Sequence, residues 1–372
     1  MDDYASAFGF REWPFRIVVD ESFARVWADR SDIREDLEKR MRRMKGLPHS
    51  TVQLMWADFG AGKSHSLRHI EWKCMQDPDR KLIPIYTEVP VGLDGLITIY
   101  RQLAGAIPPD LLQEASRSVV KGSIKVPASQ GGQDLWQALR AYGTGASAAQ
   151  SIAAEWLRAP AKNPSVPTLK TIGITSRIED ETRIVEVVAA LVHLVHSMRP
   201  GASLVWLVDE YQRTADLTVR KREAFAKGLV TLFNSCTSGL HLVLSFSVAQ
   251  QETALHLIPQ DLRSRARGFP VLALPYLDRA NALAFCHDLF SAFRSDAVGS
   301  AAAPFTPESL ELVIKAVETT SAERVTPRVL MELLSAVLLE IRDSTPSEDH
   351  IVLPLSPETV AATLSTIPGS SV

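Results

Sequence analysis

Cysteines, an excess of one charge and long apolar runs are all scarce in this sequence. Its 372 residues include only three cysteines, Cys74, Cys236 and Cys286, which are far apart and show neither CxxC nor Cys/His spacing. This excludes a disulfide framework and a zinc site, and it indicates buried thiols in a reducing compartment. No apolar run approaches the roughly 18 residues of a membrane helix, and the acidic first residues lack the order of a signal peptide. We therefore expect a cytoplasmic protein that has no membrane partner.

The net charge is close to zero. Lysine and arginine number 40 against 43 aspartate and glutamate residues, which gives a formal charge of −3. This balance provides no global attraction to nucleic acid, so any contact with DNA must be local. The composition is otherwise that of ordinary globular domains, with 46% hydrophobic and 22% charged residues. The length is sufficient for two or three domains.

Residues 57–64 read Ala-Asp-Phe-Gly-Ala-Gly-Lys-Ser, the pattern of a phosphate-binding loop with alanine where glycine is commoner. A turn of small residues lets backbone N–H groups surround phosphate oxygens, and the following helix directs its N-terminal dipole at the anion. We expect Lys63 to reach the β- and γ-phosphates of ATP, and Ser64 to bind Mg²⁺. The predicted nucleotide-binding residues here are Ala57, Asp58, Phe59, Gly60, Ala61, Gly62, Lys63, Ser64 and His65.

The flanks of this loop match the context that the motif requires. Residues 51–56 form a short apolar run typical of a buried strand, and residues 65–72 repeat apolar side chains with roughly helical spacing. The alternative is a glycine turn with a solvated lysine. A loop between a strand and a helix favours phosphate binding over this alternative.

A second apolar run, residues 203–208, ends in Asp209 and Glu210. Buried parallel strands have this composition, and ligands of open α/β sheets gather at the carboxyl ends of the strands. Asp209 is a candidate for holding Mg²⁺ through water, and Glu210 for polarising the water that attacks the γ-phosphate. The alternative is a helix or loop that begins with two acids. Because Mg²⁺ does not require the second acid, the pair favours hydrolysis of ATP over binding alone.

Strands and helices alternate through the middle of the chain, and a wholly helical pattern follows. The alternation predicts an α/β fold, a P-loop NTPase core whose parallel sheet is covered by helices, followed by a small all-helical lid domain. Helices are expected in the lid over 278–294, 307–318, 327–342 and 356–365. The expected domains are an aromatic segment and basic helix over 1–45, the ATPase core over 46–275 with an irregular insertion at about 120–180, and the lid over 276–372.

Three short motifs resemble a known group of ATPases. Phe-Gly-Phe and Trp-Pro-Phe within residues 8–15 are similar to the opening of secretion-pathway ATPases, and Trp-Ala-Asp-Arg at 27–30 resembles a segment that packs on adenine. Trp-Leu-Arg at 156–158, with residues 169–174, resembles a stretch of BREX phage-defence ATP-binding proteins, which carry glycine where Ala159 stands. With the ATP-site motifs, the chain resembles AAA+ or STAND-type ATPases near the origin-recognition initiator branch, whose bacterial relatives also include transposition regulators.

This resemblance implies further residues at the nucleotide. Arg30 belongs to the segment that packs on adenine. Ser245 or Ser247, at the end of a predicted strand, matches sensor 1, which touches the attacking water or the γ-phosphate. Arg328 follows Thr-Pro at the start of a predicted lid helix and matches sensor 2. The alternative for Arg328 is a helix-start arginine with a surface salt bridge.

The resemblance also implies an arginine finger at Arg263 or Arg265, within Asp-Leu-Arg-Ser-Arg. The planar, permanently charged guanidinium group suits the neutralisation of phosphate charge across a subunit boundary. A finger acting in trans implies a homo-oligomer, as a ring or a filament. The alternative is an arginine-rich solvated turn.

Two basic clusters are candidates for contact with double-stranded DNA. Both also contain acids, as exposed helix faces commonly do, so both interpretations stay open. The first cluster is Arg34, Lys39, Arg40, Arg42, Arg43 and Lys45, and the second is Arg220, Lys221, Arg222 and Lys227.

Two functions follow from these motifs and this resemblance. The first is an ATP-hydrolysing AAA+ ATPase that oligomerises on ATP, engages DNA and regulates a separate effector protein of a mobile-element or phage-defence system. The second is a STAND-like switch, in which ATP holds a conformation that acts on a protein partner without DNA. The two functions differ in whether Arg263 or Arg265 completes the ATP site of a neighbouring subunit.

Overall fold

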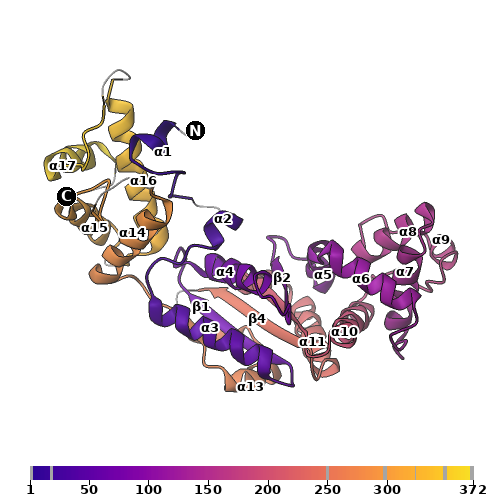
Figure 1. Ribbon diagram of the computed structural model, residues 1–372. Helices are drawn as coiled ribbons and strands as arrows, with labels where there is room; N and C mark the ends of the chain where they lie inside the picture. The colour runs from indigo at the N-terminus through magenta and orange to yellow at the C-terminus, as the bar shows by residue number, and fades with distance from the viewer. Residues whose placement is uncertain are drawn as a thin grey trace. The chain divides into compact units, whose positions relative to one another are not determined.

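The computed structural model describes residues 3–16, 20–248, 251–295, 300–322, 324–346 and 350–368. The chain divides into two compact units, whose elements are labelled in Figure 1. The boundaries expected after residues 45 and 275 stay predictions. The first unit comprises Met1–Glu38, Ala57–Trp72 and Leu274–Val372, and the second comprises Lys39–Trp56 and Lys73–Ala273.

The second unit is built on a five-stranded parallel sheet with the strand order β2-β3-β4-β1-β5. Leu82 pairs with Ser203 and Glu88 pairs with Asp209, so β2 and β3 end together. All seven residues of β3 are buried, as expected for an apolar run covered on both faces. The predicted fold class is confirmed. The strands are β1 (Thr51–Ala57), β2 (Leu82–Glu88), β3 (Ser203–Asp209), β4 (Leu240–Ser247) and β5 (Leu272–Leu274).

Long helices pack against this sheet. Helix α5 (Leu96–Ala106) packs against β2, α10 (Glu181–Met198) against β3, and α11 (Val219–Ser235) against α10. Asp180 caps α10 by accepting the N–H of Arg183 at 2.8 Å. Helix α10 buries a broad apolar stripe, which matches its sequence periodicity.

Four helices stand between α5 and α10, and Figure 1 shows them grouped around α7. The stretch 120–180, which we expected to be the least regular part, contains α7 to α9, and α7 packs against α6, α8 and α10. Its serines form helix caps: Ser129 accepts the N–H of Gly132, and Ser165 accepts the N–H of Thr168. The four helices are α6 (Pro109–Val120), α7 (Gln130–Gly143), α8 (Ser147–Arg158) and α9 (Val166–Lys170).

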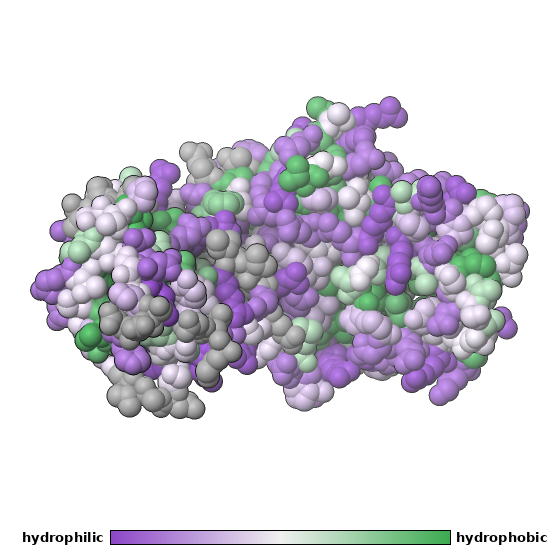
Figure 2. Space-filling view, turned by 90° about the horizontal axis from the view of Figure 1, so that it is seen from above, coloured by the Kyte–Doolittle hydropathy of each residue, from purple (hydrophilic) through white to green (hydrophobic). Residues whose placement is uncertain are grey.

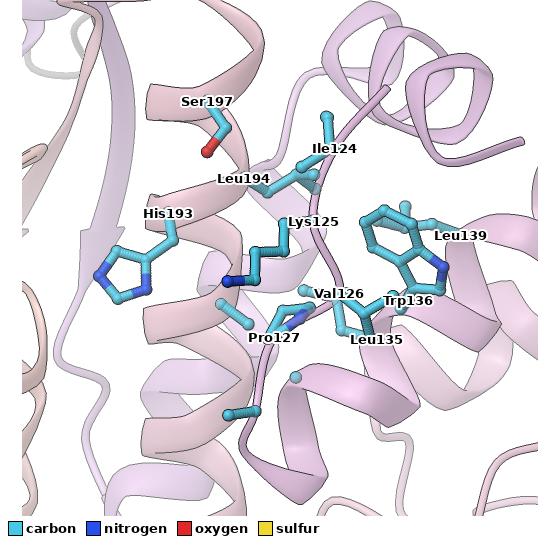
Figure 3. A pocket seen from close by; sticks show the side chains of 13 residues that line it. Ile124, Lys125, Val126, Pro127, Leu135, Trp136, Leu139, His193, Leu194 and Ser197 are labelled. Carbon is cyan, nitrogen blue, oxygen red and sulfur yellow. The ribbon is translucent and has the colours of Figure 1, made fainter. Parts of the chain in front are cut away.

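A cavity of about 290 Å³ lies between α7, α10 and the segment 124–128. Figure 3 shows the side chains around it, among them Trp136 and Lys125. Most of the lining is apolar, and its polar side chains, Lys125, His193 and Ser197, are exposed. Among the residues that line it, no buried polar group is directed at a ligand.

The first unit contains the helical lid and the N-terminal aromatic segment. The four lid helices lie within two residues of their predicted bounds. The ring of Phe10 lies 5.8 Å from that of Phe290, and Arg11 N–H donates to the carbonyl of Phe293 at 2.8 Å. The N-terminal aromatic residues are thus part of the lid core. The helices are α1 (Asp3–Ala7), α2 (Glu21–Ala24), α14 (Arg279–Phe293), α15 (Pro307–Thr320), α16 (Pro327–Ser344) and α17 (Pro357–Thr366).

The described part of the chain contains no helix long and apolar enough to cross a membrane. On the face drawn in Figure 2, hydrophobic residues form small groups among hydrophilic ones. The three cysteines are buried and free, as predicted. The remaining helices of four or more residues, several of which flank the candidate site, are α3 (Ser31–Gly46), α4 (Lys63–Met75), η1 (Tyr211–Asp216), α12 (Gln251–His256) and α13 (Gln260–Arg265).

Candidate nucleotide site

The phosphate loop lies in the first unit, between β1 and α4. Gly60 and Gly62 adopt left-handed backbone conformations, with φ of 79° and 99°. Glycine has no Cβ and accepts these angles without strain. The first intrahelical bond shown for α4 runs from Ser66 N–H to the carbonyl of Gly62, at 2.9 Å. The N–H groups of the preceding helix residues therefore have no acceptor within the helix, as an anion-binding helix terminus requires.

Lys63 is almost fully buried, with 4% of its surface exposed. Its ammonium group donates to the carbonyl of Asp58 at 2.8 Å, so the lysine lies along its own loop. Ser64, the next residue, is exposed. A buried cation and the start of a helix thus lie in one short turn, a combination that suits a phosphate chain.

His65 and His69 lie on one face of α4 and contact the segment before α3. His65 Nε2 donates to the carbonyl of Phe23 at 3.2 Å, and His69 Nδ1 to that of Ala24 at 2.8 Å. The ring of Trp27 lies 4.9 Å from that of His69. Burial lowers the pKa of His65, which favours the neutral ring. These contacts account for His65 as a residue that holds the segment, and its predicted contact with nucleotide stays a prediction.

Arg30 joins the phosphate loop to the start of the lid. Its guanidinium group donates to the carbonyl of Ala61 at 2.8 Å and also to the carbonyl of Pro275. Burial lowers the pKa of Arg30 to about 10. Asp29 and Arg30 both have a φ of 53°, a conformation that non-glycine residues seldom adopt. The strained pair directs a buried cation at the backbone of the loop.

Arg328 stands at the start of α16 and also meets the loop. Its N–H donates to the carbonyl of Gly60 at 3.3 Å, and its guanidinium carbon lies 4.5 Å from the centre of the Phe59 ring. Tyr276 donates its hydroxyl to the Asp58 carboxylate. The contacts of Asp58 with Tyr276 and of Phe59 with Arg328 were not predicted, because the motif leaves the side chains at positions 58 and 59 unspecified.

Asp209 lies in the second unit with 1% of its surface exposed. Its Oδ1 accepts from the hydroxyl of Ser245 at 2.5 Å, and its Oδ2 accepts from the hydroxyl of Tyr86 at 3.0 Å. Ser245, predicted as sensor 1, thus contacts the first acid. Tyr86 was missed, because a tyrosine in an apolar run carries no local signal of this role.

Glu210 has a left-handed backbone, with φ of 55°, and a carboxylate held by its neighbours. Ser247 donates to Oε1 and Gln212 to Oε2, both at 2.8 Å. Arg213 Nη2 lies 3.3 Å from Oε2. Ser247, the other sensor 1 candidate, therefore contacts the second acid. Gln212 and Arg213 were missed, although they stand only two and three residues after Glu210 in the sequence.

The two finger candidates lie on α13 in the second unit. Arg265 is exposed, donates to Oδ1 of Asn234 at 2.5 Å and lies 5.2 Å from the centre of the Phe233 ring. Arg263 is half-buried, and its Nε has no hydrogen-bond partner among the described residues. Arg265 is the more accessible of the two to another molecule.

The two basic clusters differ in exposure. Arg40 departs from the expected solvated face: it is 5% exposed and donates to the carbonyl of Pro270 at 2.8 Å. In the second cluster, at the start of α11, Lys221 pairs with Asp94. Arg220 and Lys227 are both exposed there.

The metal-ligand predictions concern residues of separate units. Ser64 belongs to the first unit and Asp209 to the second. Within the described ranges, no three histidine, cysteine or acidic residues are grouped as a metal site formed by protein ligands alone. A cation held chiefly by phosphate oxygens and water would not require such a group.

Comparisons with known proteins show a likeness of fold. The sequence matches no protein-family model and no curated protein. The structure is similar to that of the Orc1 protein of Aeropyrum pernix in complex with DNA, at 12% identity and a TM-score of 0.50, over 96% of this chain and 69% of that one. It is also similar to the Orc2 protein of the same organism, solved as ADPNP and ADP complexes, at 12% identity and a TM-score of 0.54, over 98% and 73%. The chain therefore has the fold of these two archaeal proteins.

Proposed function

We propose that this chain is an AAA+ ATPase that binds ATP at residues 57–64 and hydrolyses it. The observation that carries the proposal is the phosphate loop: two left-handed glycines, a buried lysine and the start of α4 lie within eight residues. The fold shared with Orc2, which was solved with ADPNP and ADP, supports the same ligand class. The sequence-based domain boundaries, with the lid beginning near residue 276, are part of this proposal.

In this proposal the loop binds the phosphates of ATP, Glu210 orients and deprotonates the attacking water, and Asp209 takes part in holding Mg²⁺. Lys63 offsets the charge of the β- and γ-phosphates. Glu210 orients a water molecule and accepts its proton, while the water oxygen bonds to the γ-phosphorus and the bond to ADP breaks. Mg²⁺ held by Ser64 and, through water, by Asp209 would neutralise phosphate charge.

Calorimetric titration of Lys63→Ala with ATP tests the loop assignment. We expect loss of measurable ATP binding, because the substitution removes the charge that opposes the phosphates. Lys121→Ala is the matched control, since Lys121 is an exposed lysine next to α6. Unchanged affinity and unchanged hydrolysis in Lys63→Ala would refute the assignment.

We further propose that the assembled ATPase contacts DNA through one face of α11. Arg220 and Lys227 are exposed and seven residues apart, which places them on one face of the helix. The neighbour Orc1 was solved in complex with DNA, which supports this class of partner. Regulation of a separate effector protein in a mobile-element or phage-defence system belongs to the same proposal.

Fluorescence anisotropy with a labelled duplex, at several salt concentrations and with an ATP analogue, tests this contact. The variant Arg220→Glu with Lys227→Glu should weaken binding. It should also make the dependence of log affinity on log salt concentration less steep by about the equivalent of two phosphate contacts, because each contact releases counterions. Lys221 stays unchanged because it pairs with Asp94. The control is Lys121→Glu with Arg140→Glu, an equal change of charge at two exposed positions. Absence of wild-type binding at low salt would favour the STAND-like switch with a protein partner.

A further inference from the structure

The phosphate-loop pattern leaves its second and third positions free, here Asp58 and Phe59. Phe59 is 66% exposed, so it does not serve the core. In the first unit both residues contact the lid, and the partners are specific side chains.

Three contacts join the loop to the lid within this unit. The Arg328 guanidinium lies over the Phe59 ring, with 4.5 Å between its carbon and the ring centre. Tyr276 donates its hydroxyl to Oδ2 of Asp58, whose Oδ1 accepts the N–H of Phe59 at 2.7 Å. Gly60 accepts the N–H of Arg328 at 3.3 Å.

Gly60 makes the close approach possible. A Cβ at this position would lie 3.0 Å from Oγ1 of Thr326 and 3.1 Å from Cβ of Arg328, which is tighter than most contacts of real Cβ atoms. Its φ of 79° independently disfavours a side chain. The start of α16 therefore depends on a glycine in the loop as well as on the side chains beside it.

The charges of these residues suit a contact that orients a cation. The hydrogen bond from Tyr276 lowers the pKa of Asp58 and raises that of Tyr276, so the donor and the charged acceptor are both favoured at neutral pH. Arg328 forms no ion pair with a carboxylate of the described residues. A ring face holds a guanidinium group without neutralising it. The charge of Arg328 therefore stays available to an anion at the loop.

We propose that Asp58, Phe59 and Gly60 form a latch with Tyr276, Thr326 and Arg328, and that this lid latch positions Arg328 beside the phosphate loop before nucleotide binds. Phe59, Asp58 and Tyr276 are thus positioning residues that act through Arg328 and the loop. The inference rests on the proposed binding of ATP at this loop. It adds a task for the side chains at loop positions 58 and 59, which the phosphate-binding pattern leaves unspecified.

The latch itself is tested without nucleotide, by amide hydrogen exchange of residues 59–62. Phe59→Ala and Tyr276→Phe should each raise the exchange rate of these amides severalfold, because each removes one support of the loop. Met75→Ala removes a similarly exposed apolar side chain from the end of α4 and should leave the rates unchanged. Equal rates in the wild type, Phe59→Ala and Tyr276→Phe would overturn the latch.

The positioning role is tested by a double-mutant cycle on affinity for a non-hydrolysable ATP analogue. Phe59→Ala should weaken binding about threefold, the size expected for an exposed cation–π pair. It should cause no further loss in an Arg328→Ala background, and Phe59→Tyr should retain wild-type affinity. Additive losses would overturn the positioning role. A wild-type chain that binds no analogue would refute the proposed function and the positioning role together, while the exchange measurement decides the latch independently.

Discussion

The phosphate loop and the acidic pair organise their functional groups in different ways. The loop relies on backbone: two left-handed glycines, a helix start and one lysine bonded to a carbonyl of its own turn. The acidic pair relies on side chains from separate elements, since Asp209 bonds to Tyr86 of β2 and to Ser245 of β4. A backbone site is therefore contained in one short segment, whereas a side-chain site requires the sheet to be assembled.

The two regions also differ in what surrounds them. The loop contacts lid residues such as Arg328, which are part of the same compact unit. The acidic pair is held by residues of the sheet unit, including Ser247. A change in the lid should therefore reach the loop directly, while a change in the sheet should reach the acids. The following variants test this division.

The largest effect is expected from Arg265→Ala on α13 of the sheet unit, and mixing this variant with a loop variant tests whether the two units act across a subunit boundary. Arg265→Ala should lower hydrolysis roughly 1,000-fold if it is a finger acting in trans. Mixing it with Lys63→Ala brings an intact loop and an intact finger together, so part of the activity should return. Phosphate release at several mixing ratios measures this recovery. No recovery, with co-assembly shown by light scattering, would contradict the finger assignment.

Glu210→Gln should separate hydrolysis from binding. The amide cannot accept a proton from water, so turnover should fall roughly 100- to 10,000-fold, while ATP affinity should change less than about twofold because the loop is intact. Calorimetry and phosphate release on the same sample provide both values. Glu223→Gln, at an exposed acid of α11, is the control. Wild-type turnover in Glu210→Gln would show that another group prepares the water.

Acid should destabilise the sheet that carries the acidic pair. His241 is fully buried on β4, its Nδ1 lies 2.9 Å from Oγ1 of Thr51, and burial lowers its pKa to about 4. Between about pH 6.5 and pH 4, His241 binds a proton in the unfolded chain, where its pKa is near 6.5, but stays neutral in the folded chain. Stability is therefore complete above about pH 6.5 and falls by about 3 kcal/mol as the pH decreases to about 4, since one pKa unit is worth about 1.4 kcal/mol.

Urea unfolding at several pH values measures this loss. His241→Asn retains a polar atom near Thr51 and cannot titrate, so its stability should vary less between pH 7 and pH 4. It should also be less stable at neutral pH, because Asn is smaller than His. An equal pH dependence in the two proteins would assign the effect to other groups.

The smallest effect is expected at the hydroxyl groups that hold the acids. Ser247→Ala removes one donor from Glu210 and should lower turnover about tenfold, the size of a hydrogen bond to a charged group. Ser245→Ala should instead raise the Mg²⁺ concentration that gives half-maximal turnover, because Ser245 contacts Asp209. Ser247→Thr retains the hydroxyl and is the control for Ser247. The same response in both alanine variants would remove the distinction between the two serines.

Much of the fold could be predicted from the sequence because its signals are local. The lid helix α16 was expected over 327–342 and spans Pro327–Ser344, since a threonine cap and proline mark its start and apolar periodicity continues through it. The strand that ends at Asp209 was predicted from its apolar run alone. Parallel order follows from the alternation of strands and helices.

Other features could not be predicted because they join residues far apart in the sequence. Phe10 and Phe290 are 280 residues apart, yet their rings lie 5.8 Å from each other in the lid core. The sequence around an aromatic residue near the N-terminus does not indicate which distant residues it will pack against. Likewise, the burial of Arg40 follows from its carbonyl partner at Pro270, whereas its own helix suggested exposure.

The sequence alone determined the phosphate loop, the acidic pair and the α/β class, because each depends on neighbours within one strand, turn or helix. Only the tertiary structure decided which side chains hold those groups: Tyr86 and Ser245 on Asp209, Ser247 on Glu210. The sheet register fixes the first set by ending β2 and β3 together, at Glu88 and Asp209. Such contacts depend on the packing of the whole unit, and no local spacing encodes them.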